Sequence, residues 1–256
     1  MSVTFRTQGI VISMRDLFEH DRIYSVLTTE HGKLELRARG SRKISSKLSS
    51  HLEPFALCDL MVVRGRYGDL VAGVERLESY RTIRQDMDKL ELAWHTLSLV
   101  ESSTRARLHD PIMFDEVRRW LTFIDAAPEL TRDRLAFLSG SFTLKLLSIL
   151  GFRPELVSCV SCERGIAPMG YSWHGLKGGV VCRDCCSREP EQWFSARRID
   201  DNSLKLIRYA MSEHFEHLLD IRLPGPILSE YHAVIESLVV AHFPVIPAVS
   251  FSRAVV

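Results

Sequence analysis

The sequence predicts an α+β multidomain protein, with a small β-barrel at its N-terminal end and an α-helical domain that carries a cysteine-rich insert. Three observations support this class. Residues 1–80 contain short runs rich in β-branched and aromatic residues, a helical period of apolar residues begins near residue 86, and two pairs of cysteines interrupt the helical part. A chain of 256 residues is long enough for two or three small domains, predicted as 1–80 and 81–256.

The N-terminal part contains five strand-like runs. QGIVISM is the first, and RIYSVLTT and LELRARG follow as a hairpin, since the short segment between them holds Gly32, which tolerates a positive φ. LCDLMVVR and LVAGVERL form a second pair, and the segment from Ser41 to Leu52 crosses between the third run and the fourth. Five strands with one crossover favour a five-stranded OB-fold barrel, with an SH3-like barrel as the main competitor.

Apolar residues that recur on one face predict five helices after residue 86. The first presents Met87, Leu90, Trp94, Leu97 and Val100. Asp110 and Pro111 supply an N-cap and a first helical residue for the second, which ends near Pro128. The third runs from about Thr131 to Gly151. The last two span about 202–219 and 229–243, the final one with Phe243 on its inward face.

Four cysteines form two pairs within a predicted metal-binding insert, residues 157–188. Two residues separate Cys159 from Cys162 and Cys182 from Cys185, and nineteen residues lie between the pairs. This spacing matches the C-x2-C-x15–20-C-x2-C pattern of a zinc ribbon, in which four thiolates surround one Zn²⁺ ion. Because four thiolates close the coordination shell, the predicted role of this zinc is structural.

Alternatives to this ligand set remain open. Cys186 could replace Cys185 as the fourth ligand, although Cys185 restores the two-residue spacing, and all four cysteines could be unliganded. A zinc deaminase would need H-x-E and Pro-Cys-x-x-Cys motifs, but His174 is followed by Gly-Leu and neither pair follows a proline. Cys58, on a predicted strand, is expected to be a small core residue.

A basic stretch follows the third predicted strand, in a chain whose formal net charge is only +1. Period-2 alternation places Leu34, Leu36 and Ala38 toward the core and the charged residues between them on the open face. OB barrels bind nucleic acids across this region, where a row of cations can track phosphates. The candidate DNA-binding residues are Lys33, Arg37, Arg39, Arg42, Lys43, Lys47, Arg64 and Arg66. A solvated face without a partner is the alternative.

Other groups near the basic stretch could add contacts. The serines and backbone amides of GSRKISSKLSS can donate hydrogen bonds to phosphate oxygens. Tyr24 and Tyr67 are possible stacking platforms for bases, with packing inside the barrel as the alternative for both.

The sequence also excludes several classes. It holds no run of 18 apolar residues and no signal peptide at its start, so a cytoplasmic protein with reduced thiols and no membrane span is expected. It has no G-x-x-x-x-G-K-[ST] and no G-x-S-x-G motif, so neither a bound nucleotide nor a catalytic residue is expected. His20, Asp21 and His31 could form an acid/base cluster, but such residues in loops are usually solvated.

The segment HGKLELRARGSRKISSKLSSHLEPF resembles the signature of the bacterial RecO family of recombination mediators. In that family a hairpin strand runs into Gly-(Ala/Ser)-Arg-Lys, and a Leu-x-Pro-Phe-like end precedes the fourth strand. The resemblance covers the whole length of the chain, including the place of the cysteine insert. Zinc cysteines are not universal in the family, so they support the resemblance without being diagnostic.

The resemblance implies a DNA repair protein that binds single- and double-stranded DNA, anneals complementary strands and hydrolyses no nucleotide. It also implies contacts with RecR and with the C-terminal tail of the single-strand binding protein SSB, which help RecA to replace SSB at the nucleoid. Phe142, Lys145 and Leu146 are the candidate tail site, with ordinary core packing as the alternative. An RNA-binding or transcription-associated zinc-ribbon protein is the alternative function.

Overall fold

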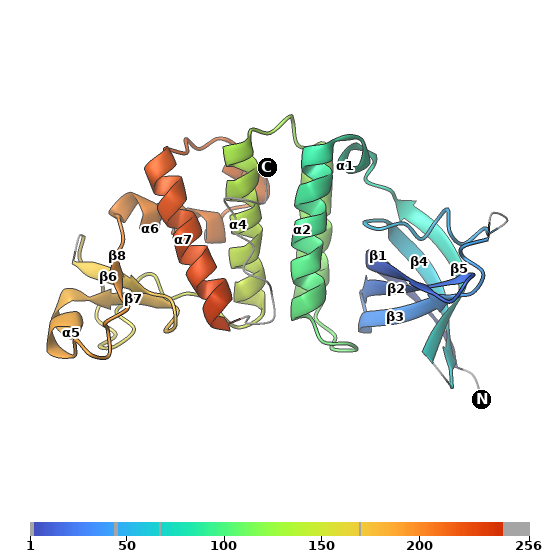
Figure 1. Cartoon of the computed structure of the whole chain (residues 1–256), viewed down its shortest axis with the longest axis horizontal. Coiled ribbons are helices and arrows are strands. Elements are labelled where there is room, and N and C mark those ends of the chain that lie inside the picture. Colours follow the sequence, from blue (N-terminus) through green and yellow to red (C-terminus); the bar gives the residue numbers. More distant parts are fainter. Residues whose placement is uncertain (1–2, 44–45, 67, 169, 243–256) are drawn as a thin grey trace. The chain divides into compact units, whose positions relative to one another are not determined.

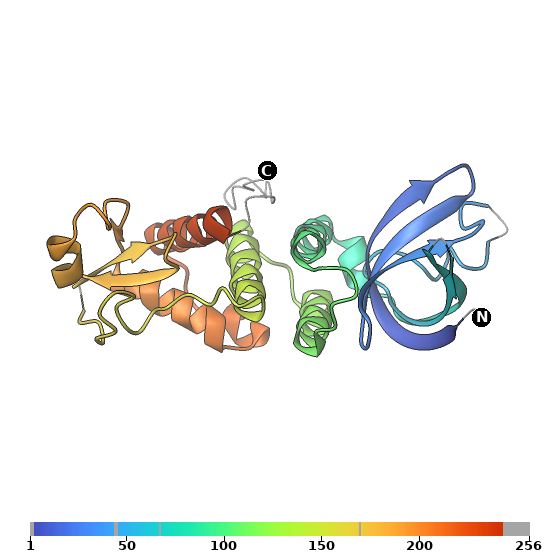
Figure 2. The same ribbon diagram turned by 90° about the horizontal axis from the view of Figure 1, so that it is seen from below.

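The computed structural model describes residues 3–43, 46–66, 68–168 and 170–242, so that Tyr67 and Phe243 lie outside the described residues. The chain forms two compact units, Met1–Pro128 and Glu129–Val256. They are coloured blue to green and green to red in Figures 1 and 2. The predicted boundaries at residues 80 and 81, and those of the insert at 157 and 188, rest on changes in sequence pattern and stay predictions.

Five strands close the barrel of the first unit. They are β1 (Thr4–Leu17), β2 (Asp21–Thr28), β3 (Gly32–Ala38), β4 (Leu57–Gly65) and β5 (Gly68–Glu78). Their order is β1-β2-β3-β5-β4, with β4 paired back to β1 and with β3 and β5 in parallel (Figure 1). This closure confirms the predicted five-stranded OB-fold barrel.

Alternation along β3 fills the barrel with apolar side chains. Leu34, Leu36 and Ala38 are buried, as predicted, and Glu35 between them is exposed. They share one cluster with Cys58, whose thiol has its pKa raised to about 12 by burial. Cys58 is therefore a core residue, as predicted, and its high pKa keeps it protonated near neutral pH.

Helices α1 (Arg81–Gln85), α2 (Met87–Ser103) and α3 (Pro111–Ala126) complete the first unit. The predicted inward face of α2 is partly wrong, because Met87 and Trp94 are exposed. Helix α2 contacts both β1 and α3, so its buried surface is wider than one stripe. Trp94 lies at the edge of this surface, with its ring 5.1 Å from the buried Phe55 ring. Thr96 lies on this surface and accepts a hydrogen bond from the Trp120 indole at 2.8 Å.

Helix α3 begins as the sequence predicts. The Asp110 carboxylate accepts a hydrogen bond from the Met113 backbone N–H, and Pro111 occupies the first turn, where a missing N–H costs nothing. The predicted inward residues, Met113, Val117, Trp120, Leu121 and Ile124, are all buried.

The segment after α2 packs directly on the barrel. The backbone N–H of Arg107 donates to the Lys33 carbonyl at 2.8 Å, and its guanidinium pairs with the buried Asp69 carboxylate at 2.8 Å. Gly32 has a φ of +66°, and a Cβ at this position would lie 2.2 Å from the carbonyl oxygen of Leu108. A side chain at residue 32 is therefore excluded both by backbone conformation and by space.

The second unit is built from α4 (Arg132–Ile149), α6 (Asp201–Ser212), the 3-10 helix η1 (Phe215–Leu219) and α7 (Gly225–His242), with a small sheet beside them. The prediction of one helix over 202–219 is wrong, since extended backbone at Glu213 ends α6 and a separate 3-10 turn follows. Helix α4 packs on α7, where the Ser141 and Tyr231 hydroxyls are 2.9 Å apart. Leu146 and Phe142 of α4 are buried in this core.

The small sheet contains β6 (Tyr171–His174), β7 (Gly179–Cys182) and β8 (Arg197–Arg198) in the order β7-β6-β8, and α5 (Arg183–Arg188) follows β7. The β6–β7 hairpin lies between the two cysteine pairs. Strand β8 comes from beyond the predicted insert, because its residues pair with Ser172 and Trp173 of β6.

We expect Gly32→Ala to lower the free energy of unfolding of the first unit more than Gly40→Ala does. Both glycines have similar φ, +66° and +62°, so the cost of about 1–2 kcal/mol for a left-handed residue is common to both. Only the Gly32 substitution also meets backbone, at Leu108, which adds about 1–3 kcal/mol. A urea titration, with hydrogen exchange in peptides from the barrel as its readout, measures the difference in the free energy of unfolding between the two variants.

Gly40 is the matched control because the nearest atoms to its added Cβ belong to the flexible Lys43 side chain, at 3.7 Å or more. If the free energy of unfolding falls equally in the two variants, the close approach of residue 32 to the Leu108 backbone contributes nothing to the cost of the substitution.

Candidate nucleic-acid interface and metal centre

The predicted basic face of β3 divides into cations that are used internally and cations that are exposed. The Lys33 ammonium is partly buried and donates to the Glu101 carbonyl at the end of α2, and burial lowers its pKa. The expectation that Lys33 stands on the open face is therefore wrong, because the α2 segment covers this end of the strand.

Arg37 is held by an acidic partner. Its Nη2 and Nε lie 2.6 Å and 2.8 Å from Asp21 Oδ2, and the other carboxylate oxygen of Asp21 accepts the Gly40 backbone N–H at 2.8 Å. The Gly40 N–H, and then the Arg37 guanidinium, lower the pKa of Asp21. A carboxylate held ionised in this way is a structural clamp, which does not suit the acid/base role considered for Asp21 with His20 and His31.

The cations beyond β3 are the exposed ones. Arg39, Arg42, Lys43 and Lys47 all have exposed side chains. Arg42 donates to the Phe18 carbonyl at 3.2 Å and pairs with Asp16 at 3.5 Å. For Arg39, Lys43 and Lys47 no ion pair occurs within the described residues, so these three offer positive charge to a ligand at no cost in internal contacts.

Arg64 and Arg66 lie on the β4–β5 hairpin, away from this group. Leu36 of β3 is aligned with Asp69 of β5 in a parallel pair, so residues before Asp69 run back toward the start of β3. Arg39, Arg42, Lys43 and Lys47 instead follow the end of β3. Arg64 has its guanidinium carbon 5.4 Å from the centre of the Phe5 ring. Arg64 and Arg66 therefore extend the basic surface along the barrel, toward the start of β3, and not around the barrel edge.

The aromatic and serine contacts expected beside the cations need revision. Tyr24 is fully buried in the barrel cluster, so packing, and not stacking on a base, explains it. Ser41 is buried, and Ser49 donates to the Ser46 carbonyl at 3.2 Å. An exposed aromatic residue does lie here: Phe18, at the turn between β1 and β2. Phe18 is absent from the sequence-predicted set because a single aromatic in a short turn carries no periodic signal.

Four cysteines converge in the second unit. The Sγ atoms of Cys159, Cys162, Cys182 and Cys185 all lie within 4.8 Å of one another, and none of these cysteines forms a disulfide. Cys159 and Cys162 come from the loop before β6, Cys182 ends β7 and Cys185 lies on α5. Cys186, the alternative ligand, falls outside this group and packs against its side.

The geometry fits a tetrahedral ion held by sulfur. Four thiolates at about 2.3 Å from one zinc ion have their sulfur atoms about 3.8 Å apart. Cys162 Sγ and Cys182 Sγ are 3.8 Å apart, and the Cys159 sulfur accepts the backbone N–H of Cys182 at 3.3 Å. Above all the backbone N–H of Arg164 lowers the pKa of Cys162 to about 6, whereas the pKa of Cys185 is raised, so the placement of the four sulfur atoms, and not their pKa values, carries the fit.

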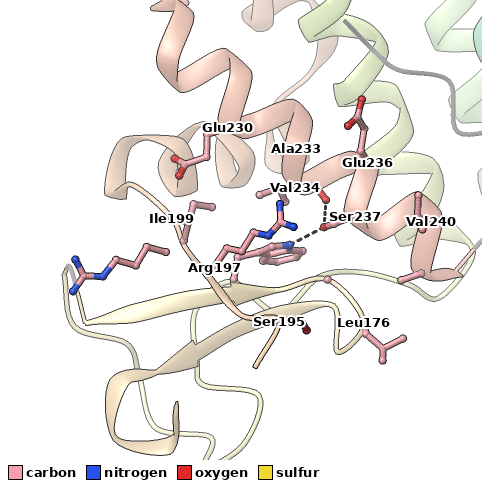
Figure 3. A pocket seen from close by; sticks show the side chains of 14 residues that line it. Leu176, Ser195, Arg197, Ile199, Glu230, Ala233, Val234, Glu236, Ser237 and Val240 are labelled. Carbon is pink, nitrogen blue, oxygen red and sulfur yellow. Dashed lines mark hydrogen bonds between the residues drawn. The ribbon is translucent and has the colours of Figure 1, made fainter. Parts of the chain in front are cut away.

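A pocket of about 820 Å³ lies between the small sheet and α7. Its apolar wall includes Trp173, Leu176, Ile199 and Val240, and Trp173 donates to the Ser237 hydroxyl at 2.8 Å (Figure 3). Figure 3 shows Arg197 on the sheet side, with Glu230 and Glu236 on the facing helix. Arg197 and Arg198 form no ion pair within the part of the chain that the structure describes.

The predicted tail site on the third helix is not a surface. Phe142 and Leu146 are buried, and the Lys145 ammonium donates to the carbonyls of Met211 and Glu213 at 3.3 Å and 2.8 Å. These residues are core, which was the stated alternative.

Among the described residues, no helix is both long and apolar enough to cross a membrane.

Comparisons with known proteins agree with this architecture. The family model described as recombination protein O N terminal matches residues 1–80, and the one described as recombination protein O C terminal matches residues 84–245. The protein named DNA repair protein RecO from Cutibacterium acnes is 36% identical over 193 residues, which cover 71% of this chain and 74% of that protein. Proteins of the same name from Rubrobacter xylanophilus and Thermoanaerobacter sp. are similar too. They are 30% identical over 190 residues (74% and 75% of the two chains) and 26% over 240 residues (94% and 93%). The chain therefore belongs to the recombination protein O family of DNA repair proteins.

Proposed function

We propose that this chain is a recombination mediator that binds single- and double-stranded DNA on the basic surface of its barrel and anneals complementary strands. One observation carries the proposal: Arg39, Lys43 and Lys47 are exposed and without ion pairs in the described residues, at the end of β3 in a closed OB-type barrel. Cations without internal partners are suited to phosphate oxygens. Lys33 is left out of the proposed contact, and Arg37 acts mainly in holding the loop.

With RecR, the protein would help RecA to replace SSB on DNA, in the cytoplasm and at the nucleoid. Family membership supports these partners. Annealing is downhill once complementary bases meet, so no nucleotide need be hydrolysed. The obstacles are repulsion between phosphates, which a basic surface reduces, and the SSB coat, which a direct contact with SSB can open.

A non-enzymatic role is part of the proposal. Within the described residues, Ser195 and His174 of the second unit form a hydroxyl–imidazole contact, with Oγ and Nε2 3.1 Å apart. However, His174 Nδ1 accepts the Lys177 backbone N–H at 3.1 Å, and burial lowers the pKa of His174. A neutral ring with Nδ1 as acceptor carries its proton on Nε2, so it cannot take the Ser195 proton.

We further propose that Cys159, Cys162, Cys182 and Cys185 hold one structural Zn²⁺. A bound zinc ion would supply cross-linking between the loop before β6, the end of β7 and α5. Around the thiols lie the buried Val181 and Trp193, a small apolar cluster that a bound ion would reinforce.

Purified protein should contain one zinc ion per chain, and Cys162→Ser should lose it and lower the melting temperature of the second unit. The reason is that metal binding supplies folding free energy directly in sites of this kind. Elemental analysis and thermal unfolding measure the two effects.

Cys186→Ser is the control for the zinc experiment, since Cys186 packs beside the four thiols without belonging to them. Zinc well below one ion per chain in the wild type would end the metal proposal. Loss of zinc in Cys186→Ser but not in a Cys185→Ser variant would move the fourth ligand to Cys186.

Changing Arg39 and Lys43 together to Ala should weaken DNA binding with little effect on stability. Both side chains are exposed, and exposed substitutions usually change the free energy of unfolding by less than about 0.5 kcal/mol. Each lost phosphate contact should flatten the plot of log affinity against log salt by about 0.7 on single strands, or by about 1.4 for two. Fluorescence anisotropy over a salt series gives the slope.

Arg118→Ala with Arg119→Ala on α3 is the control for net charge, because it also removes two positive charges from an exposed surface, one of them paired with Glu116 at 3.0 Å. If both double variants change the slope equally, net charge and not the basic surface governs binding. Equal affinity for RNA and DNA oligomers of one length would favour the RNA-binding alternative.

The protein should speed annealing of SSB-coated complementary strands without added nucleotide, and Arg197→Ala with Arg198→Ala should remove that part of the effect which needs the SSB tail. The pocket beside α7 combines an apolar wall with Arg197 and Arg198, which lack ion pairs in the described residues, on the side of the small sheet, and with Glu230 and Glu236 on the facing helix. An acidic and apolar peptide would therefore have to lie along the arginine side. Annealing time courses with full-length SSB, tailless SSB and no SSB measure the effect.

The Arg39/Lys43 variant serves as the control here, since it should slow annealing on all three substrates. No acceleration on any substrate by wild-type protein would show the mediator proposal to be wrong. Equal acceleration with full-length and tailless SSB would leave DNA binding intact and remove the tail contact.

A further inference from the structure

The turn between β1 and β2 displays an aromatic ring to solvent. Strand β1 ends at Leu17 and β2 begins at Asp21, so that Phe18 opens the three-residue connection. The Phe18 side chain is 76% exposed, and its φ is +56°, in the left-handed region that large residues rarely adopt. Neither burial of the ring nor an easy backbone explains this residue at this position.

Hydrogen bonds fix the backbone of the turn while leaving the ring uncovered. The Arg42 backbone N–H donates to the His20 carbonyl at 3.0 Å, and the Arg42 guanidinium donates to the Phe18 carbonyl at 3.2 Å. Asp21, directly after the turn, binds Arg37 and the Gly40 backbone N–H. The turn is thus tied to the loop that carries the exposed cations, although more than twenty residues of sequence separate Phe18 from that loop's Arg42.

Cations lie on the loop beside the ring, and of the acidic residues at this turn Asp21 and Asp16 are paired with Arg37 and Arg42, while Glu19 is exposed. The guanidinium carbon of Arg37 is 5.8 Å from the ring centroid, and Arg39, Arg42 and Lys43 are exposed on the adjoining loop. An exposed π-face among cations is poorly suited to an apolar protein partner, because burying it would also desolvate these charges. It suits a ligand that has both a flat aromatic face and a negative charge nearby, which describes a nucleotide of a single strand.

We propose that Phe18 is a stacking platform for a base of single-stranded DNA, with the neighbouring cations on the phosphates to either side. This inference rests on the proposed DNA-binding function and adds a preference for single strands. In a duplex each base already stacks on its neighbours inside the helix, so its face is closed to the ring. Phosphates are accessible in single-stranded and in duplex DNA, so the cations can bind both, whereas the ring can stack only on a base of a single strand.

The test compares Phe18→Ala, Phe18→Leu and Phe18→Trp in the full-length protein, by anisotropy with an oligothymidine and with a duplex of the same length. Phe18→Ala should raise the Kd for the single strand about 5- to 150-fold, since a stacked base contributes about 1–3 kcal/mol. The Kd for the duplex should change less than about twofold on the same argument. Phe18→Trp should restore single-strand binding and Phe18→Leu should not, because only a π-face stacks.

Two further measurements distinguish stacking on Phe18 from a contact with phosphate. The salt slope should be the same in Phe18→Ala as in the wild type, since losing a stacked base releases no phosphate counterions. The fluorescence of a 2-aminopurine base in the single strand should be quenched by wild-type protein and less so by Phe18→Ala. Phe194→Ala is the matched control, because Phe194 is also a highly exposed phenylalanine, 85%, but belongs to the second unit.

The outcomes separate this inference from the proposed function. If Phe18→Ala weakens single-strand and duplex binding equally, the residue only supports the cation loop and the platform assignment is wrong. If Arg39/Lys43 substitution weakens binding and Phe18→Ala leaves it unchanged, the basic surface stands without the platform. If wild-type protein binds neither form of DNA, the proposed function fails together with the inference.

Discussion

The basic surface of the barrel depends on a single carboxylate, that of Asp21. One oxygen accepts from Arg37 on β3 and the other accepts the Gly40 N–H at the start of the following loop. These bonds turn the chain out of β3 and set where the next cations stand. Asp21 therefore neutralises one positive charge of the surface and in doing so orients the loop that follows, where Arg39, Lys43 and Lys47 form no ion pair within the described residues.

Because the Asp21 carboxylate must be ionised to hold this loop, the basic surface is expected to lose its ordered arrangement at acid pH. Its pKa is lowered by the Gly40 N–H and by Arg37, so the folded state gains stability from this group above the ordinary carboxyl pKa. That contribution is lost as pH falls through the lowered value. The loop that carries Arg39 and Lys43 is expected to loosen over the same acid range, well below neutral pH.

Local patterns in the sequence predicted much of this fold, and long-range contacts account for what they missed. Alternation in β3 and the spacing of Cys159, Cys162, Cys182 and Cys185 are set within a few residues, so both could be predicted. The use of Lys33 by α2 and of Arg37 by Asp21 depends on distant segments, and the charge pattern alone predicted eight equivalent cations. The buried face of α2 was predicted only in part for the same reason, since two neighbours enlarge it. Strand β8 joins the small sheet from outside the cysteine pattern, where no spacing rule applies.

The contacts around Gly32 have a consequence for dividing the chain. The loop after α2 packs against the carbonyl of Lys33, the carboxylate of Asp69 and the backbone at Gly32. A fragment that ends at residue 80 keeps all five strands but loses Arg107, the partner of a carboxylate that is almost completely buried in the whole chain. It also uncovers one end of the barrel. The smallest portion expected to behave as an independent folding unit thus extends to about Pro128, past the point where the strand pattern stops.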